Sequence, residues 1–222
     1  MSMSTRLQKY VYDLTTFPGD ARLLYRRGGW REVRQALAER TIYRLVRMER
    51  MLVIAQDLEH VRAVAPPAGV TIRPIAEGDW AAFATLVPRR DFDRFRALVA
   101  NGHTCLVAWR GAQPIGYTWY TSRLTPDVSQ LPIPLPPTGA YLWDVYVVPA
   151  ERSNGIGSAL VTARLRLARD AGFQEGWRII APSNRPSLRT VDKTAGNGRV
   201  VGEIRFVKLF SKLMARYRPA PR

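Results

Sequence analysis

A short segment in the second half of the chain combines a basic side chain with two closely spaced glycines. Arg152, Gly155 and Gly157 form the pattern Arg-x-x-Gly-x-Gly, directly behind Val147-Val148-Pro149. Residues 141–148 are strand-like, and an apolar stripe at helical spacing follows the glycines. A strand that turns through glycines into a helix presents unpaired backbone N–H groups at the positive end of the helix dipole. The segment is therefore expected to bind phosphate. The stripe comprises Ile156, Leu160, Ala163 and Leu167.

Spacing separates this segment from two other phosphate-binding designs. A P-loop needs Gly-Lys-Ser/Thr at the helix start, whereas Gly157 is followed by Ser158 and Ala159. A dinucleotide fingerprint needs a third glycine where Leu160 stands. An ordinary strand-to-helix turn is the remaining alternative, because a six-residue pattern alone is a weak signature.

The surrounding pattern strengthens the phosphate interpretation. Residues 104–109 and 115–121 are two strand-like runs around a glycine turn, which indicates a hairpin. A short apolar run, Trp177–Ala181, leads into Asn184-x-x-Ser187 and a second helix-like stretch. With the order strand, two helices, hairpin, strand, glycine turn, helix, strand, helix, strand, residues 70–208 resemble the GNAT superfamily of acyl-CoA-dependent N-acyltransferases. The resemblance implies an α/β (α+β) fold with a mixed central β-sheet flanked by helices.

The resemblance also implies a donor, acetyl-CoA or a longer acyl-CoA, held by the glycine loop and the second helix. No metal is expected, because two histidines and one cysteine are too few for a histidine-rich or Cys-x-x-Cys site. Cys105 and His103 could pair as a nucleophile, but a buried thiol is the favoured interpretation. The expected donor-binding residues are Val147, Val148, Arg152, Ser153, Asn154, Gly155, Ile156, Gly157, Ser158, Asn184 and Ser187.

Direct transfer of the acyl group to an amine requires hydrogen-bond donors that stabilise the oxyanion and a base that takes a proton from the amine. In this family the backbone N–H groups around Val145–Val147 would serve the oxyanion. Asp144 is the only acid within residues 141–148, and an aspartate in an apolar strand is costly without a partner. Asp144 is therefore a candidate base, and a structural aspartate is an equal alternative.

The proton for the leaving thiolate has no obvious source. Family members usually carry a tyrosine seven residues after the asparagine, and that position is Val191 in this chain. Tyr146 is the candidate replacement, with Tyr117 and Tyr120 as further choices, although aromatic residues in strands are usually core. A thiolate can also leave with help from water.

Composition and charge limit the remaining functions. The chain has 222 residues, and its net charge is +16. No signal peptide and no run of eighteen apolar residues are visible, so a cytoplasmic protein is expected, with peripheral membrane contact as an option. The positive field would favour an acidic acyl-carrier protein as donor, whereas nucleic acid is a less favoured partner. A plain solvated basic surface is the slightly favoured explanation of the charge.

Three segments are expected along the chain. Residues 1–65 form a basic, mostly helical N-terminal extension, because the prolines and glycine of Ala65–Gly69 interrupt regular structure. Residues 70–208 form the acyltransferase domain, and residues 209–222 form a basic tail. Trp30, Val33 and Leu37 share one helical face, which is expected to pack on the domain. Every donor-binding residue lies after position 140, so the extension is expected to be dispensable for CoA binding.

The function predicted from these features is acyl transfer from a CoA or carrier thioester to a small-molecule amine. The alternative is a non-catalytic module that binds acyl-CoA or a polyanion on the same fold. Leu124–Gly139, rich in proline, is expected to border the acceptor site, with a polyproline ligand as the other interpretation.

Overall fold

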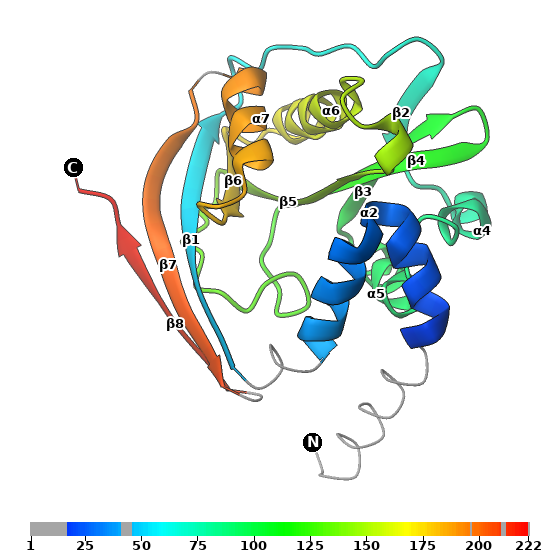
Figure 1. Cartoon of the computed structure of the whole chain (residues 1–222). Coiled ribbons are helices and arrows are strands. Elements are labelled where there is room, and N and C mark those ends of the chain that lie inside the picture. Colours follow the sequence, from blue (N-terminus) through cyan, green and yellow to red (C-terminus); the bar gives the residue numbers. More distant parts are fainter. Residues whose placement is uncertain (1–16, 41–45, 196, 210–211, 222) are drawn as a thin grey trace.

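The computed structural model describes residues 17–40, 46–195, 197–209 and 212–221 (Figure 1). The helices are α2 (Phe17–Arg40), α4 (Trp80–Phe83), α5 (Arg89–Ala100), α6 (Ile156–Asp170) and α7 (Arg185–Ala195). The strands are β1 (Val46–Asp57), β2 (Val70–Pro74), β3 (Thr104–Arg110), β4 (Gln113–Thr121), β5 (Gly139–Val147), β6 (Glu175–Ile180), β7 (Arg199–Leu209) and β8 (Lys212–Pro219). Two short 3-10 turns, Glu77–Asp79 and Pro149–Glu151, precede α4 and α6.

These strands form one eight-stranded sheet in the order β2-β3-β4-β5-β6-β1-β7-β8. Neighbours run antiparallel, except that β5 and β6 pair in parallel. The hairpin predicted at residues 104–121 is present as β3 and β4, and Gly111 takes a positive φ of 58° in its turn. The mixed sheet with its helices confirms the fold class expected from the sequence.

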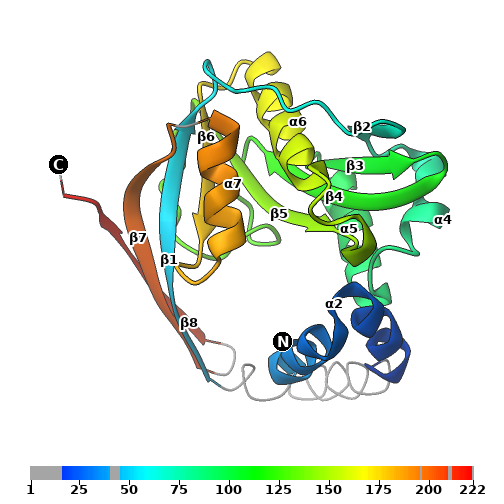
Figure 2. The same ribbon diagram turned by 45° about the horizontal axis from the view of Figure 1, so that its top comes forward.

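Helices cover the two faces of the sheet differently (Figure 2). On one face, called the α6 face, Leu142 of β5 packs with Val161 and Leu165 of α6, and α7 lies beside α6. On the opposite face, called the α5 face, Trp119 of β4 packs with Phe95 of α5. Successive residues of a strand point to opposite faces, so each inner strand contributes to both cores.

The proline-rich loop covers part of the α5 face. Ile133, near its centre, is buried in a cluster with Tyr141 of β5 and Trp177 of β6. Leu131 and Leu135 pack against the same cluster. Because its apolar side chains face the sheet, the loop acts as a cover for β5, β6 and the neighbouring strands, an arrangement that does not leave them free to bind a partner domain.

Strand β1 lies inside the sheet, although its residues precede the expected boundary at residue 65. It pairs with β6 from Leu52 to Asp57 and with β7 from Val46 to Ala55. Val53 and Ala55 are fully buried, which gives the strand a strong apolar reason to occupy this position. The sheet therefore extends into the segment assigned to an N-terminal extension. The segment assigned to a C-terminal tail contains β8, which pairs with β7 along the sheet edge.

Helix α2 is bent at Gly28-Gly29, where Gly29 has a positive φ of 67°. Val33 is buried with Leu24 and Ala36, but Trp30 and Leu37 are exposed at 66% and 43%. Trp30 and Leu37 therefore do not show the expected packing on the domain, and the cluster around Val33 consists of residues of α2. Across the part of the chain that the structure describes, no helix is both long and apolar enough to cross a bilayer.

Candidate active site

The central feature of the site is an irregularity in β5. Trp119 of β4 pairs with Trp143, but Thr118 pairs with Val145, so Asp144 is the extra residue of a β-bulge. Asp144 has a positive φ of 48°, a conformation that aspartate and asparagine tolerate better than most residues. Its side chain is exposed. The bulge turns this residue out of the apolar strand, so Asp144 avoids the burial cost that its position in the strand suggests.

The bulge lies where β5 leaves its parallel neighbour. Pairing between β5 and β6 runs only from Gly139 to Tyr141, opposite Glu175–Trp177. Beyond these pairs β5 bends away from β6, as Figure 2 shows. The backbone of β5 around the bulge is therefore not paired with β6, and it can offer N–H groups to another molecule.

The turn that follows β5 is tightly organised. Arg152 folds back, and its Nε donates to the carbonyl oxygen of Val147 at 3.0 Å. Ser153 and Gly155 have positive φ values of 66° and 81°. Glu151 accepts two hydrogen bonds from Arg110, each 2.9 Å long, and this guanidinium lowers the pKa of the Glu151 carboxyl. These contacts fix the turn against the β3–β4 hairpin.

The start of α6 meets the requirements of an anion site. Gly155 is the N-cap residue, so no side chain caps the helix. The backbone N–H groups of Ile156, Gly157 and Ser158 precede the first α-helical hydrogen bond, which Ala159 donates to Gly155 at 3.0 Å. Unpaired N–H groups at this end of a helix bind phosphate oxygens.

The surroundings of Gly157 show whether the chain itself requires glycine at this position. A Cβ atom at this position would meet only Val147 Cγ2, at an ordinary contact distance of 3.9 Å. Its backbone is helical, so neither packing nor conformation requires glycine. At Gly155 the positive φ alone requires glycine. The open space in front of Gly157 suits the close approach of a pyrophosphate.

The other predicted donor-binding residues near the turn divide by role. Ile156 is buried and packs with the partly buried Val147 and Val148, so these side chains anchor the turn. The side chain of Asn154 hydrogen-bonds to Glu151, which also lowers the pKa of that carboxyl.

Asn184 and Ser187 form a second group, at the start of α7. The Asn184 side-chain oxygen accepts from the Ser187 backbone N–H at 3.2 Å, and the Asn184 carbonyl accepts from Leu188 at 3.1 Å. Asn184 is therefore the N-cap of α7. Asn184 is exposed at the start of α7. Its side-chain NH₂ group can therefore still donate a hydrogen bond to a bound acyl-CoA.

The candidate proton donors lie in different environments. Val191 is buried against Ile54 of β1 and Ile180 of β6, so an apolar core occupies the position where the family usually has tyrosine. Tyr146 is buried in the core on the α5 face, and its ring lies 5.9 Å from the Arg152 guanidinium carbon. Its ring centroid is 5.5 Å from that of Tyr117.

A buried arginine next to the bulge was not anticipated from the sequence. Nη1 of Arg164, on α6, donates to Thr118 Oγ1 at 2.6 Å and to the Trp143 carbonyl at 3.0 Å, and so joins the two strands at the bulge. Burial and the nearby Arg178 lower the pKa of Arg164. The spacing Ile156–Leu160–Arg164 places this residue on the apolar stripe of α6, and that pattern could have revealed it.

A second buried arginine, Arg178, comes from β6. Its Nη2 donates to the side-chain oxygen of Gln56, which belongs to β1. Burial lowers the pKa of Arg178 to about 10. The N-terminal strand therefore contributes a polar side chain next to the bulge region.

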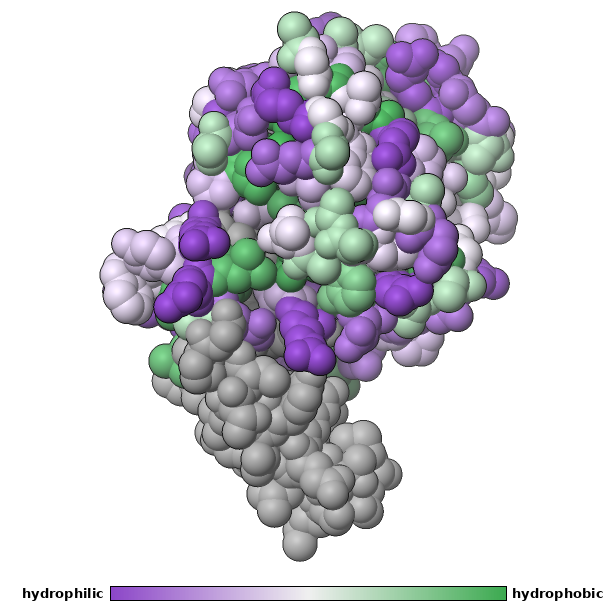
Figure 3. All heavy atoms as spheres, turned by 90° about the vertical axis from the view of Figure 1, so that its right-hand side faces the viewer, coloured by the Kyte–Doolittle hydropathy of each residue, from purple (hydrophilic) through white to green (hydrophobic). Residues whose placement is uncertain are grey.

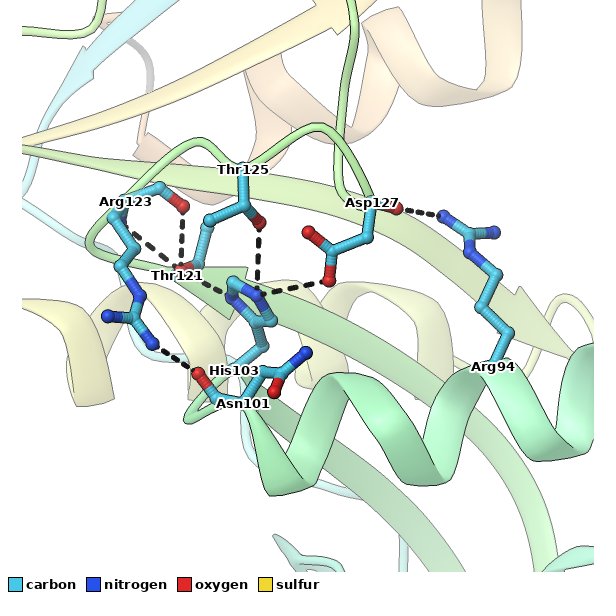
Figure 4. A network of polar contacts seen from close by, with 7 residues as sticks. All are labelled: Arg94, Asn101, His103, Thr121, Arg123, Thr125 and Asp127. Atoms are coloured by element: carbon cyan, nitrogen blue, oxygen red, sulfur yellow. Dashed lines mark hydrogen bonds and ion pairs between the residues drawn. The ribbon is translucent and has the colours of Figure 1, made fainter. Parts of the chain in front are cut away.

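His103 and Cys105 have structural environments. His103 Nδ1 lies 2.8 Å from Thr121 Oγ1, and Nε2 lies 3.3 Å from Thr125 Oγ1 and 3.8 Å from Asp127 (Figure 4). The Thr121 hydroxyl donates to the Arg123 carbonyl, so it accepts from His103. Cys105 is buried, and burial raises the pKa of its thiol, which disfavours the nucleophilic thiolate. The histidine network attaches the proline-rich loop to the start of β3.

One exposed group of potential metal ligands occurs in the described part of the chain. The ligand atoms of Asp57, Glu59 and His60, after β1, lie within 4.8 Å of one another. His60 Nδ1 is 3.0 Å from Asp57, so the group is held by its own hydrogen bond.

Comparison with known proteins defines the class of protein. Residues 72–196, more than half of the chain, match the model of the acetyltransferase (GNAT) family. The chain belongs to this family. No curated protein matches it.

Solved structures share the fold at low sequence identity. A Drosophila protein has a TM-score of 0.57 at 16% identity, over 80% of this chain and 58% of its own. A GCN5-related N-acetyltransferase from Sphaerobacter thermophilus has a TM-score of 0.54 at 17% identity, over 83% of this chain and 58% of its own. A glucosamine N-acetyltransferase region of a fungal multi-domain β-N-acetylglucosaminidase has a TM-score of 0.55 at 14% identity, over 79% of this chain and 22% of its own. The chain thus spans less than two thirds of each of these proteins.

Proposed function

We propose that the protein transfers an acyl group from acetyl-CoA or a longer acyl-CoA to the amine of a small molecule by direct attack. The observation that carries this proposal is the turn at Gly155–Ser158, where no side chain caps the start of α6 and a Cβ atom at Gly157 would meet only Val147. The pyrophosphate would accept from these groups, with Arg152 and Asn184 as further donors.

The reaction would occur beside the bulge of β5. The amine nitrogen attacks the thioester carbonyl carbon, a C–N bond forms, and the C–S bond breaks with its electron pair on sulfur. Backbone N–H groups of Val145–Val147 stabilise the oxyanion. Asp144 accepts the proton that the amine loses, and the sulfur takes a proton from the Tyr146 hydroxyl or from water. The exposure of Asp144 supports its role, since an incoming amine can reach it.

The partners follow from the same proposal. The acceptor is a small amine, and an acidic acyl-carrier protein could deliver the acyl group, because the net charge of +16 attracts a negative partner. We place the reaction in the cytoplasm, and the single cysteine agrees with a reducing compartment. No metal takes part in the proposed steps.

A second candidate function is a module that binds acyl-CoA or a polyanion without catalysis. It is favoured by one observation, the apolar core at Val191 in place of the tyrosine. Membrane contact through the basic surface would fit either function.

Release of free thiol from acetyl-CoA and longer acyl-CoA, measured over a library of amines, tests catalysis. Asp144→Asn is the informative variant, because asparagine keeps the positive φ of the bulge. We expect turnover at neutral pH to fall on the order of 10²–10⁴-fold, the usual contribution of a general base, while acyl-CoA affinity stays unchanged. Unchanged turnover would assign Asp144 a structural role. If CoA binds but no amine in the library causes thiol release from the acyl-CoA, the second candidate is favoured.

A further inference from the structure

Two arginines in the interior lack the partners that buried cations need. Arg164 and Arg178 are only 3% and 4% exposed. Their identified partners are neutral: the Thr118 hydroxyl, the Trp143 carbonyl and the Gln56 amide oxygen. Guanidinium groups stay protonated in proteins, so two positive charges are buried together here. Buried charges are normally paired with an opposite charge.

Three donor atoms of this cluster have no hydrogen-bond partner among the described residues. They are Nε of Arg164, Nε of Arg178 and Nε2 of Gln56. The charge of Asp144 acts on Arg164, but the Asp144 side chain is exposed, so it compensates the pair only in part. Three donors and two positive charges in one place favour an anion with at least two acceptor oxygens.

The cluster lies on the α6 face. Gly176 and Ile180, two positions before and after Arg178 in β6, pack against Leu165 of α6 and Val191 of α7. Alternation along the strand therefore directs Arg178 toward the same face. Arg164 reaches the sheet from α6, close enough for Arg178 to lower its pKa.

Its position relative to the proposed reaction suggests the ligand. Arg164 contacts Trp143, the residue before Asp144, and Arg178 follows Trp177, the last residue paired with β5. The cluster thus lies next to the bulge where the proposed function puts the thioester. Arg164 is two helical turns, about 12 Å, from the start of α6. That separation makes the cluster distinct from the pyrophosphate site.

We propose that Arg164, Arg178 and Gln56 bind the terminal carboxylate of a short dicarboxylic acyl group, as in succinyl-CoA. This inference rests on the proposed function and specifies its donor. The carboxylate oxygens accept from the three partnerless donors and neutralise the buried charge. The transfer step itself is unchanged, and the product amide keeps the free carboxylate.

Calorimetric titration of the full chain with CoA, succinyl-CoA and butyryl-CoA tests the inference. Succinyl and butyryl groups both have four carbons, and only the former ends in a carboxylate. We expect succinyl-CoA to bind at least tenfold more tightly than butyryl-CoA. Arg178→Gln should remove this preference and leave CoA affinity unchanged, whereas Arg178→Lys should retain part of it.

The possible outcomes separate the two proposals. Equal affinity for succinyl-CoA and butyryl-CoA, with normal binding of CoA, would overturn the carboxylate site and leave the proposed function intact. No binding of CoA at all would overturn both. The comparison of donors uses the unmodified chain, so it remains decisive even if the Arg178 variants do not fold.

Discussion

Gly157 stands at a position where the chain itself has no need of glycine. Its backbone is helical and its surroundings are open. Glycine in a helix costs roughly 0.5–1 kcal/mol relative to better helix formers. A phosphate bound in the open space, as proposed above, would account for glycine at this position.

Gly157→Leu should separate stability from binding. We expect the free energy of unfolding to rise by roughly 0.5 kcal/mol through helix propensity. CoA affinity should fall at least tenfold, because the new side chain occupies the space of the phosphate oxygens. Denaturant unfolding and calorimetry measure the two effects. Gly78→Ala, another open glycine without positive φ, is the control. Undiminished CoA affinity in a folded Gly157→Leu protein would remove the basis of the donor site.

His103 should make the protein sensitive to mild acid. Burial lowers its pKa from 6.5 in the folded state, with an opposing effect from Asp127 and a further lowering from Arg123. As the pH decreases below 6.5, the unfolded chain binds more protons at this histidine than the folded chain. The free energy of unfolding therefore decreases as the pH is lowered, until the folded pKa is reached. We expect the unfolding free energy of His103→Gln to vary less between about pH 7.5 and pH 5 than that of the parent.

His60 provides the matched control for this prediction. Its pKa is raised, mainly by the hydrogen bond to Asp57, so its contribution is present below pH 6.5 and is lost as the pH rises through the folded pKa. His60 is exposed, and its effect should be small. His60→Gln should therefore keep or slightly steepen the loss of stability in acid. Parallel stability curves for the parent and His103→Gln would show that His103 is not the responsible group.

At the scale of secondary-structure elements, β1 is the strand that joins β7 and β8 to the rest of the sheet. It pairs on both sides, with β6 and with β7, and it carries fully buried Val53 and Ala55. Gln56 on the same strand bonds Arg178. The N-terminal segment therefore supplies an inner strand, and β7 and β8 reach the sheet only through it.

Removal of residues 1–68 should abolish folding rather than spare CoA binding, contrary to the expectation from sequence. The shortened chain loses β1, so β6 and β7 have no common partner. We expect no cooperative thermal transition and no CoA binding. A chain that starts at residue 41 keeps β1 and loses α2, and it should still fold and bind CoA. Cooperative unfolding of the chain that starts at residue 69 would contradict this role of β1.

The elements that could be predicted are those whose information is local. The turn at Arg152–Gly157 and the β3–β4 hairpin are marked by Gly155 and Gly111, whose positive φ values favour glycine. The place of β1 depends on pairing with residues far along the chain, which hydrophobic periodicity does not reveal. The bulge at Asp144 depends on the register with β4, and the burial of Arg178 depends on neighbouring strands. None of these leaves a local pattern.

At the scale of the whole molecule, the positive charge is distributed over surface elements. Figure 3 views the side on which β2 and α4 lie, and shows hydrophilic residues over much of it with small apolar areas between. Basic residues spread over the surface attract a negative partner over a long range. Exposed basic residues outside the site include Arg22, Arg26, Arg31 and Arg34 on α2 and Lys212, Arg216 and Arg218 on β8.

Salt dependence should reveal whether an acyl carrier uses this field. With an acidic carrier thioester as donor, kcat/KM should fall steeply as salt rises from about 0.05 M to about 0.5 M, because screening shortens the range of attraction. With a CoA thioester as donor, kcat/KM should decrease less with salt, because CoA carries fewer negative charges than an acidic carrier protein. Steady-state kinetics with both donors measure the difference. Equal salt dependence would assign the surface charge no role in donor choice.

The position of β1 also has a consequence for synthesis on the ribosome. Val46–Asp57 is made long before its partners at Glu175–Ile180 and Arg199–Leu209, which follow more than one hundred residues later. At usual elongation rates this apolar strand waits on the order of ten seconds without its neighbours. The sheet cannot close before β6 and β7 have been made, and such long-range pairing is slow to form. The nascent chain must therefore keep this strand from aggregating until β6 and β7 have emerged, and a chaperone that binds extended apolar segments would find a site here.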